Sequence, residues 1–270
     1  MSTRPKFRPF TGDTSRTILL EEPPLPLVLC QIRWPELSYM QGDLKPLAIS
    51  FGEKIAGYPL FRESQELSFN LTPDGVHESS GSTVYQWQSI DGNWTVSLGR
   101  RFLSFHSSQY TNFEDFSSRF REVVQKLSDV ASIPLIERVG VRYVNQITDD
   151  AFISQLGLYV SEGVAGYSTL APAAPTARLV NNVNQALYEV EDVMLQVRSG
   201  IIPAGETVDA SIQARNSESW ILDMDAFSVQ LQPFSVDAAL ETAGKLSDTA
   251  YDFFKLVTTD GFIARFGGDK

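Results

Sequence analysis

The fold is decided by one stretch, which reads Trp94-Thr-Val-Ser-Leu-Gly-Arg-Arg-Phe-Leu-Ser-Phe-His106, then Asn112-Phe-Glu-Asp-Phe116 through Val130, then Glu137-Arg-Val-Gly-Val-Arg-Tyr-Val-Asn-Gln146. In the first and last parts apolar residues recur at every second position over short runs, which is typical of strands. In the middle part they recur every three or four residues, which is typical of an amphipathic helix. This order of strand, helix and strand predicts an α+β fold.

Local signals set the limits of these elements. Asp91-Gly-Asn93 lies between two strand-like runs and predicts a hairpin, because glycine accepts the positive φ that tight turns need. The alternation changes phase near Gly99, which predicts a β-bulge within a single strand over 94–107. Thr111 and Glu114 have the spacing of a capping box and predict the start of the helix.

The rest of the chain predicts a second set of strands followed by a second long helix. Strands are expected at 27–34, 188–198, 208–214 and 220–229, helices within 47–61 (ending before Pro59) and from Ser235 onward, and a loop at 72–83. We therefore expect an antiparallel sheet packed against two long helices, in two similar strand-strand-helix halves. The expected divisions are a flexible N-terminal arm over 1–22, a first subdomain over 23–150, a connecting segment over 151–177 and a second subdomain over 178–270.

The composition is typical of a globular protein that does not enter a membrane. Hydrophobic residues make up 43% of the 270 residues, and no apolar run approaches the roughly 18 residues that a membrane helix needs. The single Cys30 and the absence of an N-terminal signal predict a reducing, cytoplasmic location. The net charge of -11 argues against direct binding to nucleic acid, whose phosphates attract basic faces.

Motifs of common enzyme chemistry are missing from the sequence. It has no glycine-rich phosphate loop, no Gly-x-Ser-x-Gly elbow, no Cys-x-x-Cys pair and no His-Glu-x-x-His. With two histidines and one cysteine, nucleophilic catalysis has few constellations to draw on. We therefore expect a protein that binds rather than catalyses, without a cofactor.

The strand expected over 135–147 carries the candidate binding residues. Alternation places Arg138 and Arg142 on one face, about 13 Å apart, and Glu137, Tyr143 and Asn145 on the opposite, apolar face. The two arginines predict either a platform for a carboxylate, a phosphate or an acidic segment, or an outer face paired with acidic residues of the chain. The polar residues on the apolar face need partners, which a ligand, solvent or a loop would supply.

Asp223 and Asp225 are a weaker candidate site. Two carboxylates at positions i and i+2 of a strand share a face and suit Mg²⁺ or Mn²⁺. Aspartates on an edge strand also guard against unwanted pairing. Neither His77 nor His106 has metal-ligand spacing to a second histidine or to cysteine, and no bound metal is expected.

Several segments together carry a resemblance: Pro23-Pro24 before Leu27-Val-Leu-Cys-Gln-Ile-Arg33, Trp94-Thr-Val-Ser-Leu98, Tyr110-Thr-Asn-Phe-Glu-Asp-Phe116, and above all Arg138-Val-Gly-Val-Arg-Tyr-Val-Asn-Gln-Ile147. These segments resemble a sporadically distributed prokaryotic family without an assigned activity. Leu222-Asp-Met-Asp225 and Tyr251-Asp-Phe-Phe254 extend the resemblance into the second half, more loosely. The patchy distribution of that family implies a role in conflict, such as that of an antitoxin, an immunity protein or a defence accessory.

We therefore expect a non-enzymatic cytoplasmic module that binds a protein partner and neutralises or regulates it. A partner with a basic surface would be attracted by the charge of -11. Two alternatives stay open. One is a small-molecule pocket between sheet and helices, which the aromatic content and the inward Asn145 and Glu137 favour. The other is metal-dependent phosphotransfer or nuclease activity at Asp223 and Asp225.

Overall fold

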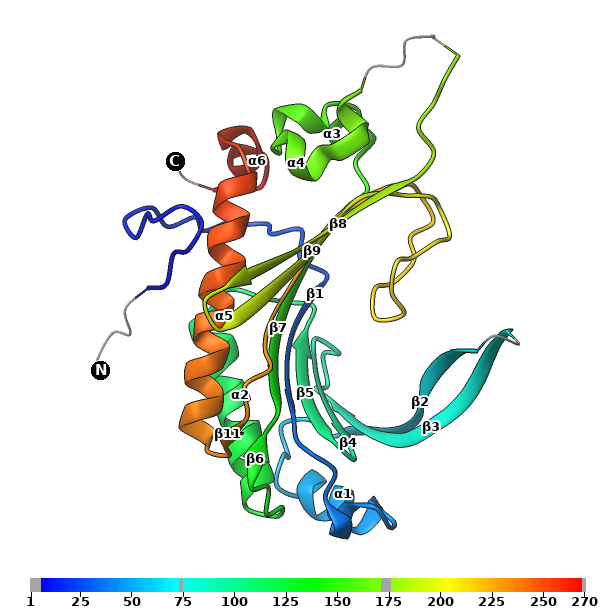
Figure 1. Cartoon of the computed structure of the whole chain (residues 1–270), viewed down its shortest axis with the longest axis vertical. Helices are drawn as coiled ribbons and strands as arrows, with labels where there is room; N and C mark the ends of the chain where they lie inside the picture. Colours follow the sequence, from blue (N-terminus) through cyan, green and yellow to red (C-terminus); the bar gives the residue numbers. More distant parts are fainter. Residues whose placement is uncertain (1–5, 73–74, 171–175, 269–270) are drawn as a thin grey trace. The chain divides into compact units, whose positions relative to one another are not determined.

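The computed structural model describes residues 6–72, 75–170 and 176–268, with side chains described in these ranges except over 66–81. Residues 1–5 of the expected arm and 171–175 of the Ala- and Pro-rich connection lie outside the described residues. The described part has the predicted α+β architecture with a large antiparallel sheet (Figure 1). Over these same ranges, no helix combines the length and apolarity needed to span a membrane.

The strands of the described chain form two sheets. They are β1 (Leu27–Arg33), β2 (Leu60–Thr72), β3 (Gly75–Gln88), β4 (Trp94–Gly99), β5 (Phe102–Ser107), β6 (Leu135–Ile136), β7 (Arg138–Ile147), β8 (Asn182–Val190), β9 (Val193–Ile202), β10 (Ser219–Ser228) and β11 (Gln232–Pro233). The larger sheet has the order β2-β3-β4-β5-β1-β7-β10-β9-β8, and β11 pairs with β6 in the smaller one.

Helices connect and cover these strands. The α-helices are α1 (Lys45–Gly52), α2 (Phe113–Ser128), α3 (Asp150–Ser154), α4 (Glu162–Ala165), α5 (Val236–Val257) and α6 (Asp260–Arg265), and the 3-10 turns are η1 (Ser38–Met40), η2 (Leu156–Leu158) and η3 (Gly166–Thr169). The chain divides into two compact units. Unit 1 comprises 1–28, 140–228 and 243–270, unit 2 comprises 29–139 and 229–242, and β1, β7 and α5 contribute residues to both.

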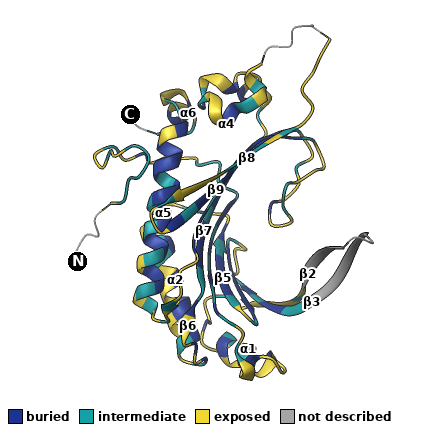
Figure 2. Ribbon diagram, in the orientation of Figure 1, coloured by how far each residue is buried: buried dark blue, intermediate teal, exposed yellow. Residues whose placement is uncertain are grey.

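In unit 2 the helix α2 packs its apolar stripe on the hairpin of β4 and β5. The Phe105 ring of β5 lies 5.2 Å from Phe116 and 6.1 Å from Phe120, centroid to centroid. The stripe is buried, whereas the opposite face of α2 is exposed (Figure 2). The helix begins one residue later than the predicted capping box, because the Asn112 side chain accepts a hydrogen bond of 2.9 Å from the N–H of Asp115.

The predicted bulge at Gly99 is wrong, because the chain reverses there. The strand expected over 94–107 is the antiparallel pair β4 and β5, in which Gly99 is the partner of Phe102 and Arg100-Arg101 form the turn. A two-residue turn shifts the phase of the apolar alternation along the sequence, and a β-bulge within one strand would produce the same shift. The buried Trp34 fixes this turn: its indole N–H donates to the carbonyl of Arg100 at 3.0 Å, and its backbone N–H donates to that of Arg101 at 3.0 Å.

Two other expectations for unit 2 need correction. The loop expected over 72–83 is largely strand, because β2 and β3 pair along their length as a long antiparallel hairpin. Its Ser- and Thr-rich sequence lacks apolar alternation, so the pairing of the backbones gives no sequence signal. The helix expected within 47–61 ends at Gly52, and β2 already begins at Leu60. The hairpin predicted at Asp91-Gly-Asn93 is confirmed, with Gly92 at a φ of 76°.

In unit 1 the helix α5 packs against the sheet, and the N-terminal segment packs against α5. The Asp248 carboxylate accepts a hydrogen bond from the N–H of Phe7 at 3.1 Å. The buried Asp252 accepts from the N–H groups of Phe10 and Thr11 at 2.7 and 2.9 Å. These contacts hold the segment on α5 where the sequence predicted a flexible arm.

The remaining strand predictions are right for β10 in unit 1 and wrong at three places, of which the break at Glu137 lies in unit 2. The strand expected over 188–198 is the β8–β9 hairpin, whose turn holds Glu191 at a φ of 53°. The strand expected over 208–214 belongs to the loop between β9 and β10, and the strand expected over 135–147 is interrupted at Glu137. The β8–β9 turn, Glu191-Asp192, and the interruption at Glu137 contain neither proline nor glycine. The sequence therefore has no local signal that would predict these two breaks.

The ring cluster around Phe105 makes a testable prediction about the core of unit 2. Phe105 is fully buried among Tyr58, Trp94, Phe116 and Phe120. Phe105→Ala should lower the free energy of unfolding by about 3–5 kcal/mol, because it leaves a cavity as well as losing contacts. Urea unfolding followed by far-UV circular dichroism measures the loss.

The matched control for this prediction is Ile90→Ala, since the Ile90 side chain is 83% exposed. It should change the stability by less than about 0.5 kcal/mol. Equal losses for the two variants would contradict the assignment of Phe105 to the core.

Candidate functional site

Two of the predicted candidates, Arg142 and Asp223, meet in an ion-pair network of unit 1, which we call the sheet network: Arg142, Arg198, Asp209 and Asp223. The register pairs Asp223 of β10 with Arg198 of β9. Asp223 is 2% exposed, and its Oδ1 accepts from Nε of Arg142 at 2.7 Å. Its Oδ2 accepts from Nη2 of Arg142 at 2.9 Å and from Nη2 of Arg198 at 2.6 Å.

The sheet network holds the loop between β9 and β10 against the sheet. Nη1 of Arg142 donates to the Ser211 hydroxyl at 2.9 Å, and Nη2 of Arg198 donates to Asp209 at 3.3 Å. Further along β7, the amide oxygen of Gln146 accepts from Nε of Arg215 at 2.9 Å. The outer face of β7 thus contacts the loop between β9 and β10 of the same chain.

Two groups of the sheet network, Asp209 and Arg142, have pKa values shifted in the direction that favours their charged forms. Burial opposes ionisation of Asp209, but hydrogen bonds from Ser211 and the charges of the two arginines outweigh it and lower its pKa to about 2. Burial likewise works against the charge of Arg142, whereas its hydrogen bonds to Asp223 and the surrounding aspartates raise its pKa. A carboxylate with a lowered pKa and a guanidinium with a raised pKa are poor proton acceptors and donors near neutral pH, so Asp209 and Arg142 do not suit acid–base catalysis.

The arrangement at Asp223 also does not suit a metal. Both carboxylate oxygens already accept hydrogen bonds from guanidinium groups, which are repelled by a cation. Asp225 is not free either, because it interacts electrostatically with Arg142. In the part of the chain that the structure describes, no three His, Cys, Asp or Glu side chains gather as a metal site would require.

The remaining predicted residues have separate partners rather than a common site. Tyr143 shares a buried hydrogen bond of 2.8 Å with the Ser247 hydroxyl of α5. The buried Asn145 donates to the carbonyl of Leu222 at 3.3 Å. Glu137 pairs with Arg101 in unit 2 at 2.9 Å, and Arg138 is half-buried with interactions of its own.

A cavity of about 420 Å³ lies between the sheet and the helices of unit 1, and we call it the inner pocket. Alternation along the hairpin turns Asn184, Ala186 and Tyr188 of β8 toward it, and the register adds Val197 and Ser199 of β9. The α4 region and the end of α5 form the opposite wall, through Ser161, Gly163, Val164, Phe253, Leu256 and Val257. Its lining mixes apolar side chains with a few hydroxyl and amide groups.

The strand β8 forms one edge of the large sheet and is unusually apolar for an edge. In the order of the described strands, one side of β8 has no neighbouring strand. Its exposed side chains include Val183 and Leu187, which are 43% and 58% exposed, and the exposed Leu179 and Val180 lie just before it. Proteins usually protect such edges with proline, lysine or a bulge, and β8 contains none of these.

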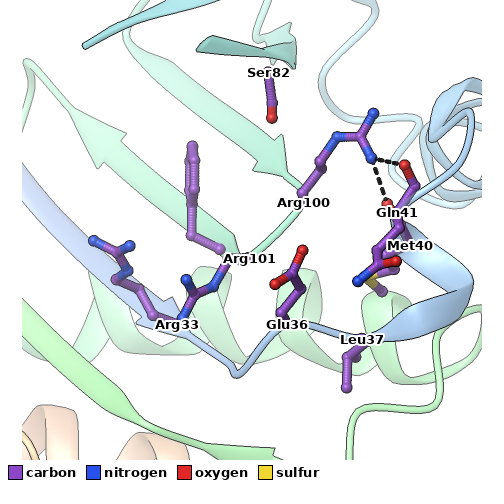
Figure 3. Close-up of a pocket in the computed structure, with 9 residues that line it drawn as sticks. Arg33, Glu36, Leu37, Met40, Gln41, Ser82, Arg100 and Arg101 are labelled. Atoms are coloured by element: carbon purple, nitrogen blue, oxygen red, sulfur yellow. Dashed lines mark hydrogen bonds between the residues drawn. The ribbon is translucent and has the colours of Figure 1, made fainter. Parts of the chain in front are cut away.

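A cluster that the sequence did not reveal lies in unit 2, where Arg33 at the end of β1 lies beside Arg101 of the β4–β5 turn, while the side chain of Arg100 turns toward Met40 and Gln41 (Figure 3). The three arginines line a cavity of about 150 Å³, together with Glu36, Met40 and Phe102, and we call it the arginine cleft. The only signal was the adjacent pair Arg100-Arg101, because Arg33 is 67 residues away from Arg100 and lies on another strand.

No protein-family model matches the chain, and no curated protein matches its sequence.

The sheet network makes a second testable prediction. Asp223→Asn keeps the shape of the side chain but leaves two poorly exposed guanidinium groups with one fewer negative charge. We expect a loss of stability on the order of 3 kcal/mol, because an uncompensated buried charge is costly. We also expect faster proteolytic cleavage in the loop over 203–218, which limited trypsin digestion with mass spectrometry detects.

Glu206→Gln is the control within the same loop, since Glu206 is exposed and lies outside the network. Its stability and cleavage rate should match those of the unchanged protein. If Asp223→Asn behaves like this control, the network does not hold the loop.

Proposed function

We propose that this chain is a non-enzymatic, cytoplasmic protein-binding module that neutralises or regulates a partner, and that the partner docks by adding a strand to β8. The observation that carries the proposal is the exposed, apolar and unprotected edge that β8 presents. Strand addition to such an edge is a common way of recognising an extended segment, since main-chain hydrogen bonds provide affinity and alternate side chains provide specificity.

The register tells which backbone groups are free to pair. Two turn residues join Val190 and Val193, so these two form a hydrogen-bonded pair at the end of the hairpin. Hydrogen-bonded pairs alternate along an antiparallel ladder. The N–H and C=O groups of Glu189, Leu187 and Gln185 therefore point away from β9, toward the open side of the sheet.

The charge around this edge favours a basic occupant. Residues 140–228, which include β8, contain eleven Asp and Glu against four Arg and no Lys. All four arginines are engaged with Asp223, Asp209, Gln146 or Glu218. An extended segment that alternates apolar with lysine or arginine residues would satisfy both the apolar side chains and the excess negative charge.

The biological setting of the proposal rests on the sequence. The resemblance of Arg138–Ile147 and the other segments to a sporadically distributed prokaryotic family supports a role like that of an antitoxin, an immunity protein or a defence accessory. We also propose that the two strand-strand-helix halves are related. The β4–β5 hairpin precedes α2, and the β8–β9 hairpin with β10 precedes α5, which supports this relation.

The test compares two substitutions at one position of β8. Leu187→Pro removes an outward N–H that only a docked strand would use, and an edge strand tolerates proline at such a position. Leu187→Thr keeps the N–H and shortens the side chain. Each form is purified from the native cells at about 0.15 M salt, and bound proteins are quantified by mass spectrometry.

A stoichiometric partner should accompany the unchanged protein and the threonine variant and be lost from the proline variant. Raising the salt to about 1 M, where charges are screened within about 3 Å, should release it. A partner that binds the proline variant equally well, or no partner at all, would overturn docking on β8. Circular dichroism confirms that the proline variant is folded.

The inner pocket favours a second candidate function, the binding of a small molecule between sheet and helices. Its volume of about 420 Å³ falls in the range of ligand pockets, and hydroxyl and amide groups of Asn184, Ser199 and Ser161 line it. The Tyr188 ring lies 5.5 Å from that of Phe253 and adds an aromatic wall. A mainly apolar small molecule with one or two polar groups would match this lining.

Native mass spectrometry of the protein purified without denaturation tests this candidate. Ala186→Phe fills the inner pocket, whereas Leu187→Phe adds the same ring on the opposite face of β8. We expect an additional small mass on the unchanged protein and on the Leu187 variant, and its loss from the Ala186 variant. A bare mass for the unchanged protein, or a mass that Ala186→Phe leaves in place, would argue against this function.

A further inference from the structure

A serine interrupts the apolar inner face of β9. The inward side chains of this strand are buried and apolar except at one position: Val193, Leu195, Val197, Ser199 and Ile201. The register places Ser199 beside Asn184 of β8, and both line the inner pocket. Ser199 is 2% exposed, so bulk solvent has little access to its hydroxyl. A buried hydroxyl needs a partner, either from the fold or from a ligand.

The fold does not supply a partner for the Ser199 hydroxyl. Within the described ranges, this hydroxyl has neither a donor nor an acceptor at hydrogen-bonding distance. Leaving it unpaired costs free energy that alanine at the same position would avoid. The buried Ser247 of the same unit shows the usual arrangement, since its hydroxyl shares a hydrogen bond of 2.8 Å with Tyr143. Ser199 is thus free to anchor a molecule in the inner pocket.

The Asn184 amide adds a second polar group at this end of the inner pocket. Its Nδ2 donates to the backbone carbonyl of Ser199 at 3.4 Å. Its amide oxygen accepts no hydrogen bond from the residues that the structure describes. A ligand hydroxyl could therefore accept from Ser199 and donate to Asn184, and a ligand carbonyl could accept from Ser199.

Two aromatic rings form the other end of the inner pocket. Tyr188 lies four residues along β8 from Asn184, which is about 13 Å at the usual rise of a strand. Its ring is 5.5 Å from that of Phe253 of α5, centroid to centroid. The Phe10 ring does not line the pocket but lies 5.5 Å from Tyr188 and 5.3 Å from Phe253, and it supports both. Rings held in place in this way suit contact with another aromatic ring.

The lining of the inner pocket excludes charged ligands. None of the described residues that line it is Asp, Glu, Lys, Arg or His. Burying an ionised group without a partner of opposite charge is costly. The excess of acidic residues over 140–228 adds a repulsion for anions. The ligand that fits this lining is therefore neutral.

We infer, on the basis of the small-molecule function proposed for the inner pocket, that its ligand is an elongated, neutral aromatic molecule whose terminal hydroxyl or carbonyl is anchored by Ser199. The polar end gives the Ser199 hydroxyl the partner that the fold withholds. The aromatic end lies against Tyr188 and Phe253. Every residue of this site belongs to unit 1.

Four two-ring compounds of one shape test the ligand class by equilibrium dialysis against the full chain. They are biphenyl and its derivatives with a hydroxyl, a carboxylate or an aminomethyl group at the same terminal position. At neutral pH the carboxylate is an anion and the aminomethyl compound is a cation. We expect hydroxybiphenyl to bind at least about tenfold more tightly than either charged compound, because the pocket offers no counter-charge.

Ser199→Ala tests the anchor. It should weaken the binding of hydroxybiphenyl by about three- to tenfold, the effect of one neutral hydrogen bond. The binding of biphenyl, which has no polar group, should not weaken. The midpoint of urea unfolding should stay the same or rise, because the variant removes an unpaired buried hydroxyl.

Ser247→Ala is the matched control, because it removes a buried hydroxyl of unit 1 that is hydrogen-bonded and lies outside the inner pocket. It should show the opposite result, with a lower midpoint of urea unfolding and unchanged binding of hydroxybiphenyl.

Ala186→Phe separates the two ways in which the inference could fail. If neither biphenyl nor hydroxybiphenyl shows binding that this variant abolishes, the inner pocket is not a ligand site, and the small-molecule function fails with the inference. If both bind there but Ser199→Ala weakens neither, or a charged compound binds as tightly as hydroxybiphenyl, the pocket stands and the assigned ligand class is wrong.

Discussion

The carboxylate of Asp223 is removed from water and placed between the guanidinium groups of Arg142 and Arg198. Taking a carboxylate out of water costs several kcal/mol, and only well-placed donors offset that cost. The three residues lie on β10, β7 and β9, so the ion pairs form only when these strands have their observed register. A slip of one residue would turn Asp223 to the opposite face of the sheet and leave two guanidinium groups without it. The network is thus a constraint on how the strands of unit 1 align.

The same constraint explains why the outer face of β7 is not a free binding platform. The Arg142 guanidinium donates hydrogen bonds to Asp223 and to Ser211 of the loop that follows β9. Two polar residues on the opposite face also have partners within the chain. Tyr143 forms a hydrogen bond with α5, and Asn145 donates a hydrogen bond to β10. Buried polar groups need partners, and here the fold itself provides them. Among the described residues of unit 1, the backbone groups along the open side of β8 and the lining of the inner pocket remain available for other molecules.

Elements with a local signal could be predicted from the sequence, and contacts between distant residues could not. The helix over Phe113–Ser128 carries a stripe with helical spacing, and Gly92 marks its hairpin through the positive φ it adopts. The turns at Arg100-Arg101 and Glu191-Asp192 contain no glycine, asparagine or proline, so the sequence predicts one strand for each hairpin. Asp223 is 81 residues from Arg142 and 25 from Arg198. No spacing rule covers such separations, so the sequence indicates only the local pair of Asp223 and Asp225 and not the ion pairs of Asp223 with the two arginines.

The kind of acceptor separates two structural roles among the arginines of this chain. Arg142 and Arg198 each form ion pairs with the carboxylates of Asp223 and Asp209. Arg100 is held by the neutral carbonyls of Met40 and Gln41, which orient its guanidinium. Trp34 supports the same turn, because its indole N–H donates to the carbonyl of Arg100. The arginines of the sheet network thus align three strands through carboxylates, whereas Arg100 ties a turn to a neighbouring segment through main-chain carbonyls, which is a role that needs no acidic partner.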